Sequence, residues 1–271
     1  MNRLAERFDD LKAAGKRALI PYLTAGDPDP SHSVPLMHAL VEGGADILEL
    51  GVPFSDPMAD GPVIQAACER ALEAGTTLAR VLEMVEEFRR RDAHTPVVLM
   101  GYLNPVECMG YADFAARAAK AGVDGVLLVD LTPEEAPPVS AVLREQGLDC
   151  VFLAAPNTTD QRIRDIDSQA SGYLYYVSFK GVTGANRLDV PAVSKRVGEI
   201  RQLTRLPVAV GFGIRDAASA ASVAEAADAV VVGSAVITAV QEAGAELTAQ
   251  CDAVRNLVAG MRSAMDAVSC A

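Results

Sequence analysis

The sequence contains no tryptophan, and aromatic residues make up only 5% of its 271 positions. Half of the residues are hydrophobic, so a large core is possible, and it must be built mainly from Val, Leu, Ile and Ala. No uncharged apolar stretch approaches the roughly 18 residues that a membrane-spanning helix needs. No apolar signal-peptide region follows the charged first residues, so we expect a cytoplasmic protein.

Cysteine and histidine are both scarce. The five cysteines are odd in number and scattered, with no C-x-x-C spacing, which predicts a reducing compartment and neither a disulfide framework nor a zinc site. The three histidines fall in predicted helices or at helix ends, and none follows a strand. We therefore expect no bound metal and no histidine base. These residues are Cys68, Cys108, Cys150, Cys251, Cys270, His32, His38 and His94.

Basic residues are outnumbered: 24 Lys and Arg stand against 36 Asp and Glu, a net charge of −12. A field of that sign repels nucleic acids and anionic membrane surfaces, so neither is an expected partner. A phosphorylated metabolite remains possible, because a local group of backbone N–H donors can hold a phosphate in a negatively charged protein.

Short apolar strands alternate with longer amphipathic helices along the whole chain. Eight β-then-α units in a chain of this length predict a closed (β/α)8 barrel, the TIM barrel, rather than an open doubly wound sheet. Two helices lie outside that repeat, one over 1–15 before the first strand and one over 77–91 after the second unit. A last helix is expected over 246–267. The chain shows no linker, so 1–271 is predicted to be a single domain. The predicted strands are 18–23, 46–50, 97–101, 125–129, 150–154, 173–178, 207–211 and 228–232.

Two carboxylates flank a Gly/Pro-rich stretch that follows the second strand. Alternation along that strand puts Ile47 and Glu49 on one side and Leu48 and Leu50 on the other, and both sides are apolar. Glu49 is therefore an inward-pointing carboxyl group, which is costly unless it is paired or used, and which often has a raised pKa. Such a group is suited to general acid/base catalysis, with Asp60 as its partner. The alternative is a Glu that only caps a loop or pairs with a neighbour.

Two glycine-containing segments follow the seventh and eighth predicted strands. Each leads into a helix, whose N-terminal N–H groups and dipole favour an anion. The loops after strands 7 and 8 are a frequent phosphate site of this barrel, so we predict a phosphate cradle here; ordinary tight turns are the alternative. The cradle residues are Gly211, Phe212, Gly213, Gly233, Ser234 and Ala235.

Apolar and aromatic residues near other strand ends predict a flat-walled pocket beside the cradle. If Tyr173, Tyr175 and Val177 face inward, Tyr175 places a hydroxyl over that pocket; otherwise it is a core aromatic. Lys180 lies in a longer loop after the sixth strand. It is either a solvated residue or, less in keeping with its place past the strand, a Schiff-base former. The other predicted pocket residues are Tyr22, Met100, Tyr102, Leu127, Val129 and Leu153.

Several motifs together resemble the α subunits of tryptophan synthase. The most specific is Glu49-Leu-Gly-Val-Pro-Phe-Ser-Asp-Pro-Met-Ala-Asp60-Gly-Pro-Val-Ile-Gln65. The others are Pro21-Tyr-Leu-Thr-Ala-Gly-Asp-Pro28, Met100-Gly-Tyr-Leu-Asn-Pro105, Gly181-Val-Thr-Gly184 and Gly211-Phe-Gly213, so the resemblance extends over nearly the whole chain. Two places depart from the family pattern. Some relatives have Phe where this chain has Tyr22, and the loop after the sixth strand, which is the family's lid, begins differently here, with Phe179-Lys180.

The resemblance implies retro-aldol cleavage of indole-3-glycerol phosphate to indole and glyceraldehyde 3-phosphate, a lyase step of tryptophan biosynthesis. Glu49 would protonate indole C3 and deprotonate the glycerol hydroxyl, while Asp60 would accept the indole N–H. Tyr175 matches a pocket tyrosine of the family. Thr183 matches the lid threonine that meets Asp60 on closure. The residues that match its phosphate site are Gly184, Gly211, Phe212, Gly213, Gly233, Ser234 and Ala235.

The resemblance also implies a partner. The family's α subunit docks on a β subunit that carries pyridoxal phosphate (PLP), forming an α2β2 heterotetramer in which indole is channelled between allosterically coupled sites. No cofactor is expected in this chain, and the docking face would be formed by 53–60 and the Asn104-Pro105 region. Three alternatives remain: a Schiff-base aldolase that uses Lys180, a lyase that works without a β subunit, and a regulatory subunit with an inactive site.

Overall fold

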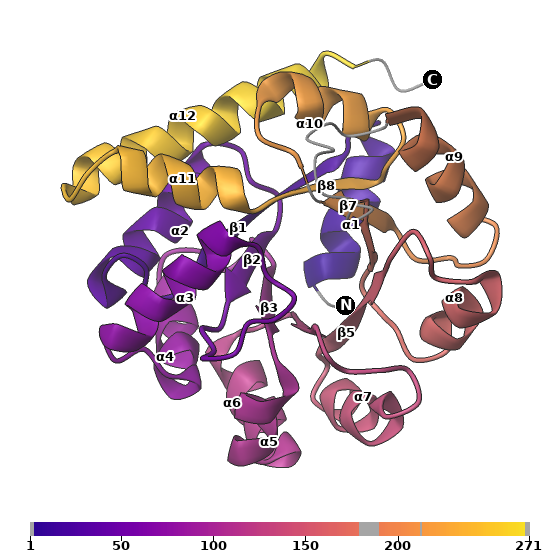
Figure 1. Ribbon diagram of the computed structural model, residues 1–271, viewed down its shortest axis with the longest axis horizontal. Coiled ribbons are helices and arrows are strands. Elements are labelled where there is room, and N and C mark those ends of the chain that lie inside the picture. Colours follow the sequence, from indigo (N-terminus) through magenta and orange to yellow (C-terminus); the bar gives the residue numbers. More distant parts are fainter. Residues whose placement is uncertain (1–2, 179–189, 212, 269–271) are drawn as a thin grey trace.

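The computed structural model describes residues 3–178, 190–211 and 213–268. Parallel strands β1 to β8 close into a barrel in sequence order, which confirms the predicted fold (Figure 1). Each predicted strand overlaps an observed one, because the apolar runs that fill a barrel wall are distinct from the amphipathic helices between them. The strands are β1 Ala18–Thr24, β2 Leu48–Gly51, β3 Val97–Gly101, β4 Gly125–Leu128, β5 Asp149–Ala154, β6 Leu174–Val177, β7 Val208–Gly211 and β8 Ala229–Val232.

Helices surround the barrel, and several begin or end where the sequence has a capping residue. The Thr77 hydroxyl accepts a hydrogen bond from the Arg80 N–H at the start of α4, and Gly122, with φ of +90°, ends α6 in the left-handed conformation. The helices are α1 Arg3–Ala13, α2 Ser33–Glu42, α3 Pro62–Glu73, α4 Leu78–Arg89, α5 Leu103–Met109, α6 Tyr111–Ala121, α7 Ala136–Glu145, α8 Asp160–Asp167, α9 Val190–Ile200, α10 Ala217–Ala224, α11 Ser234–Glu242 and α12 Leu247–Asp266, with a 3-10 turn over Pro30–His32.

The predicted extra helices are both present. The N-terminal one is α1, whose Leu4, Phe8 and Leu11 are buried in the barrel interior cluster. The one predicted over 77–91 is α4, so two helices separate β2 from β3. Of these, α4 packs between α2 and α6 in the outer ring, whereas α3 contacts α11 and β1. Helix α3 therefore lies beside the strand that carries Tyr22.

Two separate apolar clusters form the core. One fills the barrel and includes Ile47, Val98 and Leu127; the other lies between strands and helices and includes Leu48 and Leu50. The alternation predicted for β2 is thus confirmed, and it places Glu49 on the inner face. Burying a carboxyl group on that face costs free energy of folding, so hydrophobic packing does not explain why β2 carries Glu49 there.

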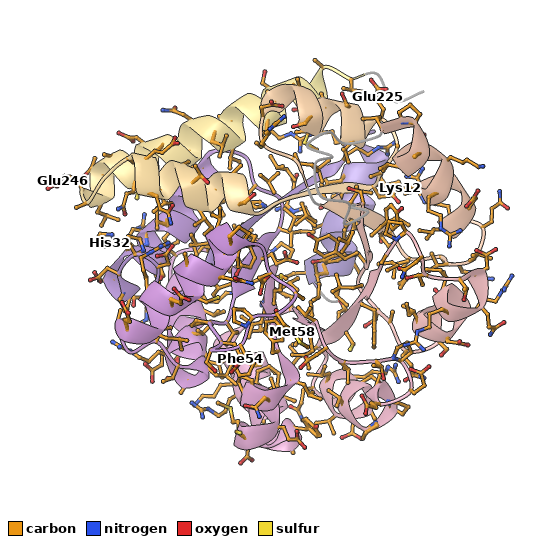
Figure 2. The ribbon with its side chains drawn as sticks, in the orientation of Figure 1. Lys12, His32, Phe54, Met58, Glu225 and Glu246 are labelled. Atoms are coloured by element: carbon orange, nitrogen blue, oxygen red, sulfur yellow. The ribbon has the colours of Figure 1, made fainter. Side chains whose placement is uncertain are left out.

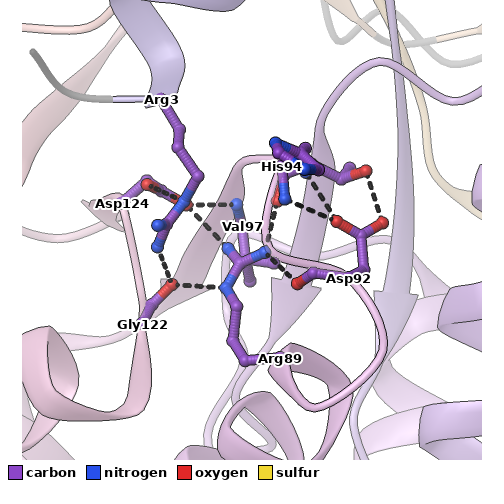
Figure 3. A network of polar contacts seen from close by, with 8 residues as sticks. Arg3, Arg89, Asp92, His94, Val97, Gly122 and Asp124 are labelled. Atoms are coloured by element: carbon purple, nitrogen blue, oxygen red, sulfur yellow. Dashed lines mark hydrogen bonds and ion pairs between the residues drawn. The ribbon is translucent and has the colours of Figure 1, made fainter.

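A charged network fixes the end of the barrel at which the strands begin (Figure 3). Asp124, just before β4, receives Arg3 Nε at 2.9 Å on Oδ1 and Arg89 Nη2 at 2.8 Å on Oδ2. The Val97 N–H also donates to Asp124 Oδ2, and both arginines donate to the carbonyl of Gly122. This network joins α1 and α4 to the sheet at the face that in such barrels serves stability rather than catalysis.

The scarce residue types are dispersed through the described structure. Cys68, Cys108, Cys150 and Cys251 are free thiols, and Cys270 lies outside the described residues. Within residues 3–178, 190–211 and 213–268, His, Cys, Asp and Glu form no group that could hold a metal ion. None of the helices in those ranges is long and apolar enough to cross a membrane.

Candidate active site

Glu49 lies inside the barrel, near the carboxyl end of β2. Its side chain is 1% exposed, and the Tyr173 hydroxyl donates a hydrogen bond to Oε1 at 3.2 Å. Burial raises the pKa of Glu49 to about 8; the negative charge of Asp60 adds to this, and the hydrogen bond from Tyr173 opposes it. Near neutral pH the carboxyl group is therefore mostly protonated, and it can donate a proton and then take one back.

Asp60 lies on the segment between β2 and α3 and is held by Tyr102. The Tyr102 hydroxyl donates to Asp60 Oδ2 at 2.9 Å and accepts a hydrogen bond from the Ala59 N–H at 3.0 Å. Gln65 Nε2 donates to the Asp60 carbonyl oxygen at 2.8 Å, which ties the segment to the start of α3. Burial raises the pKa of Asp60, and the hydrogen bond from Tyr102 opposes that rise. The Tyr102 ring packs against Phe54 with ring centroids 5.2 Å apart.

Three buried tyrosines surround Glu49. Burial raises the pKa of Tyr22, Tyr173 and Tyr175 well above the ordinary value, and the charge of Glu49 adds to the rise for each. The three phenols are therefore neutral and can donate to a carboxylate. Tyr175 faces the interior, the condition under which it was expected to reach the pocket, and its hydroxyl lies against Gly211, where an added Cβ would be only 2.2 Å from the phenolic oxygen.

Tyr173 is a site residue that the sequence analysis did not select. It directly precedes β6 and points to the same inward side as Tyr175, two residues deeper in the barrel; it is fully buried, with its ring centroid 6.0 Å from that of Phe8 of α1. The signal that could have identified it was its parity, because an inward tyrosine at that depth must find a polar partner. Glu49 is that partner.

The ends of β7 and β8 carry the residues predicted for the phosphate cradle. Gly211 ends β7, and Gly213 follows with φ of +76° and no atom within 4 Å of an added Cβ. Gly233 precedes α11, whose first two residues are Ser234 and Ala235. The first N–H groups of a helix have no intrahelical acceptor, so those of Ser234 and Ala235 are suited to an anion. Phe212, Thr183, Gly184 and Lys180 lie outside the described residues.

The predicted pocket residues occupy two depths. Met100, Val129, Leu153 and Val177 are partly buried at the rim of the barrel interior cluster. Leu127 is 0% exposed and belongs to the layer below, so Val129 is the outermost inward residue of its strand segment. Tyr22 lies on β1 and Tyr102 directly follows β3, and each is 4% exposed. The structure brings these side chains to one end of the barrel.

The fold and the site together define a (β/α)8-barrel enzyme with two carboxyl groups of raised pKa at the carboxyl end of its strands. That end is where enzymes of this architecture carry their active sites.

A family model described as tryptophan synthase alpha chain matches residues 8–266, and the chain belongs to that family. The tryptophan synthase alpha chain of Nitrosococcus oceani is 60% identical over 267 residues, which cover 98% of this chain and 98% of that protein. The one of Laribacter hongkongensis is also 60% identical, over 98% of this chain and 100% of that protein.

Solved structures agree with the sequence relatives. Tryptophan synthase subunit alpha from Legionella pneumophila str. Paris superposes with a TM-score of 0.91 at 48% sequence identity, covering 98% of this chain and 99% of that one. Mycobacterium tuberculosis tryptophan synthase gives a TM-score of 0.88 at 39% identity, over 97% and 98% of the two chains. The chain is thus a lyase that cleaves indole-3-glycerol phosphate, and its family works with a β subunit.

Proposed function

We propose that Glu49 carries out both proton transfers of the cleavage. The reaction adds a proton to indole C3, breaks the bond from C3 to the glycerol carbon, and removes the proton of that carbon's hydroxyl as the aldehyde forms. One proton enters and one leaves, so a single carboxyl group that starts protonated can serve both steps. The observation that carries this proposal is the raised pKa of Glu49, about 8, at a buried position on the inner face of the barrel.

Asp60 is proposed to accept the indole N–H and to stabilise the positive charge that develops on the protonated ring. Tyr102 holds the Asp60 carboxyl group through a 2.9 Å hydrogen bond and so fixes where that negative charge lies. Aromatic and apolar side chains at the strand ends form the indole-binding walls. The walls are Tyr22, Met100, Tyr102 and Tyr175, with Leu127 in the layer beneath them.

The substrate phosphate is proposed to lie between the ends of β7 and β8. There the open space at Gly213 and the N-terminus of α11 offer backbone N–H donors without a competing side chain. The proposed phosphate residues are Gly184, Gly211, Phe212, Gly213, Gly233, Ser234 and Ala235. Thr183 is proposed as the lid residue that meets Asp60.

The proposed assembly is an α2β2 heterotetramer in which the β subunit holds PLP and receives indole from this chain. The chain itself is proposed to be a single barrel domain and to be located in the cytoplasm. PLP would supply the chemistry of the β subunit's own step, and no step in this chain depends on it. Met58, 81% exposed, and the partly buried Phe54 lie on the segment that ends at Asp60 (Figure 2). A partner that covers Met58 and Phe54 would bury apolar surface and, at the same time, contact the segment that carries Asp60.

The test is indole release from indole-3-glycerol phosphate by the purified chain, with and without a β subunit. We expect slow release that the β subunit accelerates, and its loss in Glu49→Gln while the substrate still binds. Glu145→Gln, an exposed position on α7, is the matched control. Full turnover in Glu49→Gln would overturn the role of Glu49. Fast release that the β subunit does not change would point to a stand-alone lyase.

A further inference from the structure

Tyr22 and Gly51 fit together at the ends of β1 and β2. A Cβ added to Gly51 would lie 2.1 Å from the Tyr22 phenolic oxygen, 2.5 Å from Cζ and 2.7 Å from Cε2. The strand register pairs Tyr22 with Glu49 and Thr24 with Gly51. The Tyr22 phenol therefore starts beside Glu49 and extends across the neighbouring strand to Gly51, two residues further along.

The requirement for glycine at position 51 is one of space and not of backbone conformation. The φ angle of Gly51 is not positive, so the backbone at this position would accept an L residue. Residues 49 and 51 of one strand point to the same face, which here is the barrel interior. The Tyr22 phenol thus fills the volume that a side chain at position 51 would take, directly beyond the Glu49 side chain toward the substrate-binding end.

The Tyr22 hydroxyl is held in that place. Thr24 Oγ1 donates to it at 3.1 Å, and both residues are buried. Burial, followed by the charges of Cys68, Asp60 and Glu49, keeps the pKa of Tyr22 high, so the phenol is neutral beside the carboxyl groups. Tyr173 holds Glu49 from the deeper side by its 3.2 Å hydrogen bond. Glu49 therefore lies between a phenol below it and a phenol above it.

We propose that Tyr22 and Gly51 form a matched pair that positions Glu49. The phenol, seated over the Gly51 α-carbon, covers the carboxyl group from the mouth of the barrel and limits its side chain to one place. Tyr22 is in this respect a positioning residue, in addition to any contact that it makes with indole. The inference rests on the proposed catalytic role of Glu49.

The test is a double-mutant cycle of Gly51→Ala, Tyr22→Leu and both together. In the wild-type background Gly51→Ala displaces the phenol, and we expect kcat for indole release to fall by at least about 10-fold, since misplacing catalytic groups by about 1 Å can cost about 100-fold. Tyr22→Leu removes the three atoms that an alanine would meet. Gly51→Ala should therefore cost less than about 2-fold when added to Tyr22→Leu. Gly260→Ala, on an exposed position of α12 with free space around it, is the matched control.

The second readout is the titration midpoint of the Glu49 carboxyl group, followed by carbon NMR in each variant and assigned with Glu49→Gln. We expect Gly51→Ala and Tyr22→Leu each to move the midpoint down from about 8, because water reaches the carboxyl group. Equal losses from Gly51→Ala in both backgrounds, or an unchanged midpoint, would overturn the inference.

The midpoint also separates this inference from the proposed function, since it can be read in a protein that does not turn over substrate. If Gly51→Ala does not fold, the midpoint in Tyr22→Leu alone decides the outcome.

Discussion

At the scale of the residue, the proposed chemistry of this chain depends on how Glu49 is surrounded. Its pKa is raised to about 8 from an ordinary value of 4.5. The folded state then binds more protons than the unfolded state between these values, so the contribution of Glu49 to stability is fully present below about pH 4.5 and is lost as the pH rises through 8. The loss extends from about pH 4.5 to 8 and is complete in alkaline solution. The barrel thus tolerates a group that weakens it, which is typical of a residue kept for function.

The residue scale is also where sequence analysis succeeded and failed most clearly. Glu49 could be predicted because one strand's alternation decides its direction. Tyr173 and the hydrogen bond from Tyr102 to Asp60 could not, because each depends on how residues from separate strands and loops meet in space. Gly51 belongs to the most specific motif of the sequence, yet its proposed role depends on the reach of Tyr22 from the neighbouring strand.

Asp60→Asn tests the proposed electrostatic role of the second carboxyl group. The neutral amide cannot balance a positive charge on the indole ring, so we expect the barrier to rise by about 2–4 kcal/mol, with substrate affinity changed less. Steady-state rates of the isolated chain measure this. Asp56→Asn, an exposed carboxylate on the same segment, is the control. A rate equal to wild type would remove Asp60 from the mechanism.

At the scale of the element, each strand end presents a different function on a common scaffold. β2 carries the proposed acid Glu49, β3 leads into Tyr102, and β7 and β8 lead into the proposed cradle. Strand positions could be predicted because apolar runs between amphipathic helices are distinctive. The sequence could not predict that α4 lies in the outer ring while α3 packs on α11. Both helices have amphipathic sequences, and only packing distinguishes them.

Gly213→Leu tests the cradle. A leucine would enter the open space where the phosphate is proposed to lie, so KM for indole-3-glycerol phosphate should rise by about 10-fold or more while kcat changes less. Gly147→Leu is matched to it, because Gly147 also has positive φ and open surroundings but precedes β5 at the other end of the barrel. Equal KM values in the two variants would place the cradle elsewhere.

Asp124→Ala tests the network that joins α1 and α4 to the sheet. It leaves Arg89, with a side chain only 11% exposed, without its carboxylate, so the free energy of unfolding should fall by about 3 kcal/mol or more. Urea denaturation measures the loss. Arg3→Ala, which removes a more exposed partner, should cost less. If both variants cost less than about 0.5 kcal/mol, the network makes no real contribution to stability.

At the scale of the whole molecule, the barrel separates stability from chemistry. Charged side chains close the end where strands begin, and the carboxyl groups of raised pKa gather toward the other end. The closed topology could be predicted from eight repeated units, and the family from motifs at the strand ends. The proposed partner surface could not be predicted from composition, since its residues resemble those of an ordinary loop.

Met58→Asp tests that surface. Replacing an apolar side chain that is 81% exposed with a carboxylate should weaken β-subunit binding by about 10-fold or more if the side chain is buried in the complex. Calorimetric titration of the two subunits measures the affinity. Leu72→Asp changes the other exposed large hydrophobic residue of the described structure and serves as the control. Equal affinities in both variants would exclude the segment around Met58 from the interface.

Glu49 is proposed to hold its proton near neutral pH and therefore to begin the reaction as an acid. The most direct measurement is the pH titration of its carboxyl carbon by NMR in glutamate-labelled protein, with Glu49→Gln to assign the signal. We predict a midpoint near 8. A midpoint near the ordinary value of 4.5 would contradict it, because the carboxyl group would then be ionised before the substrate arrives.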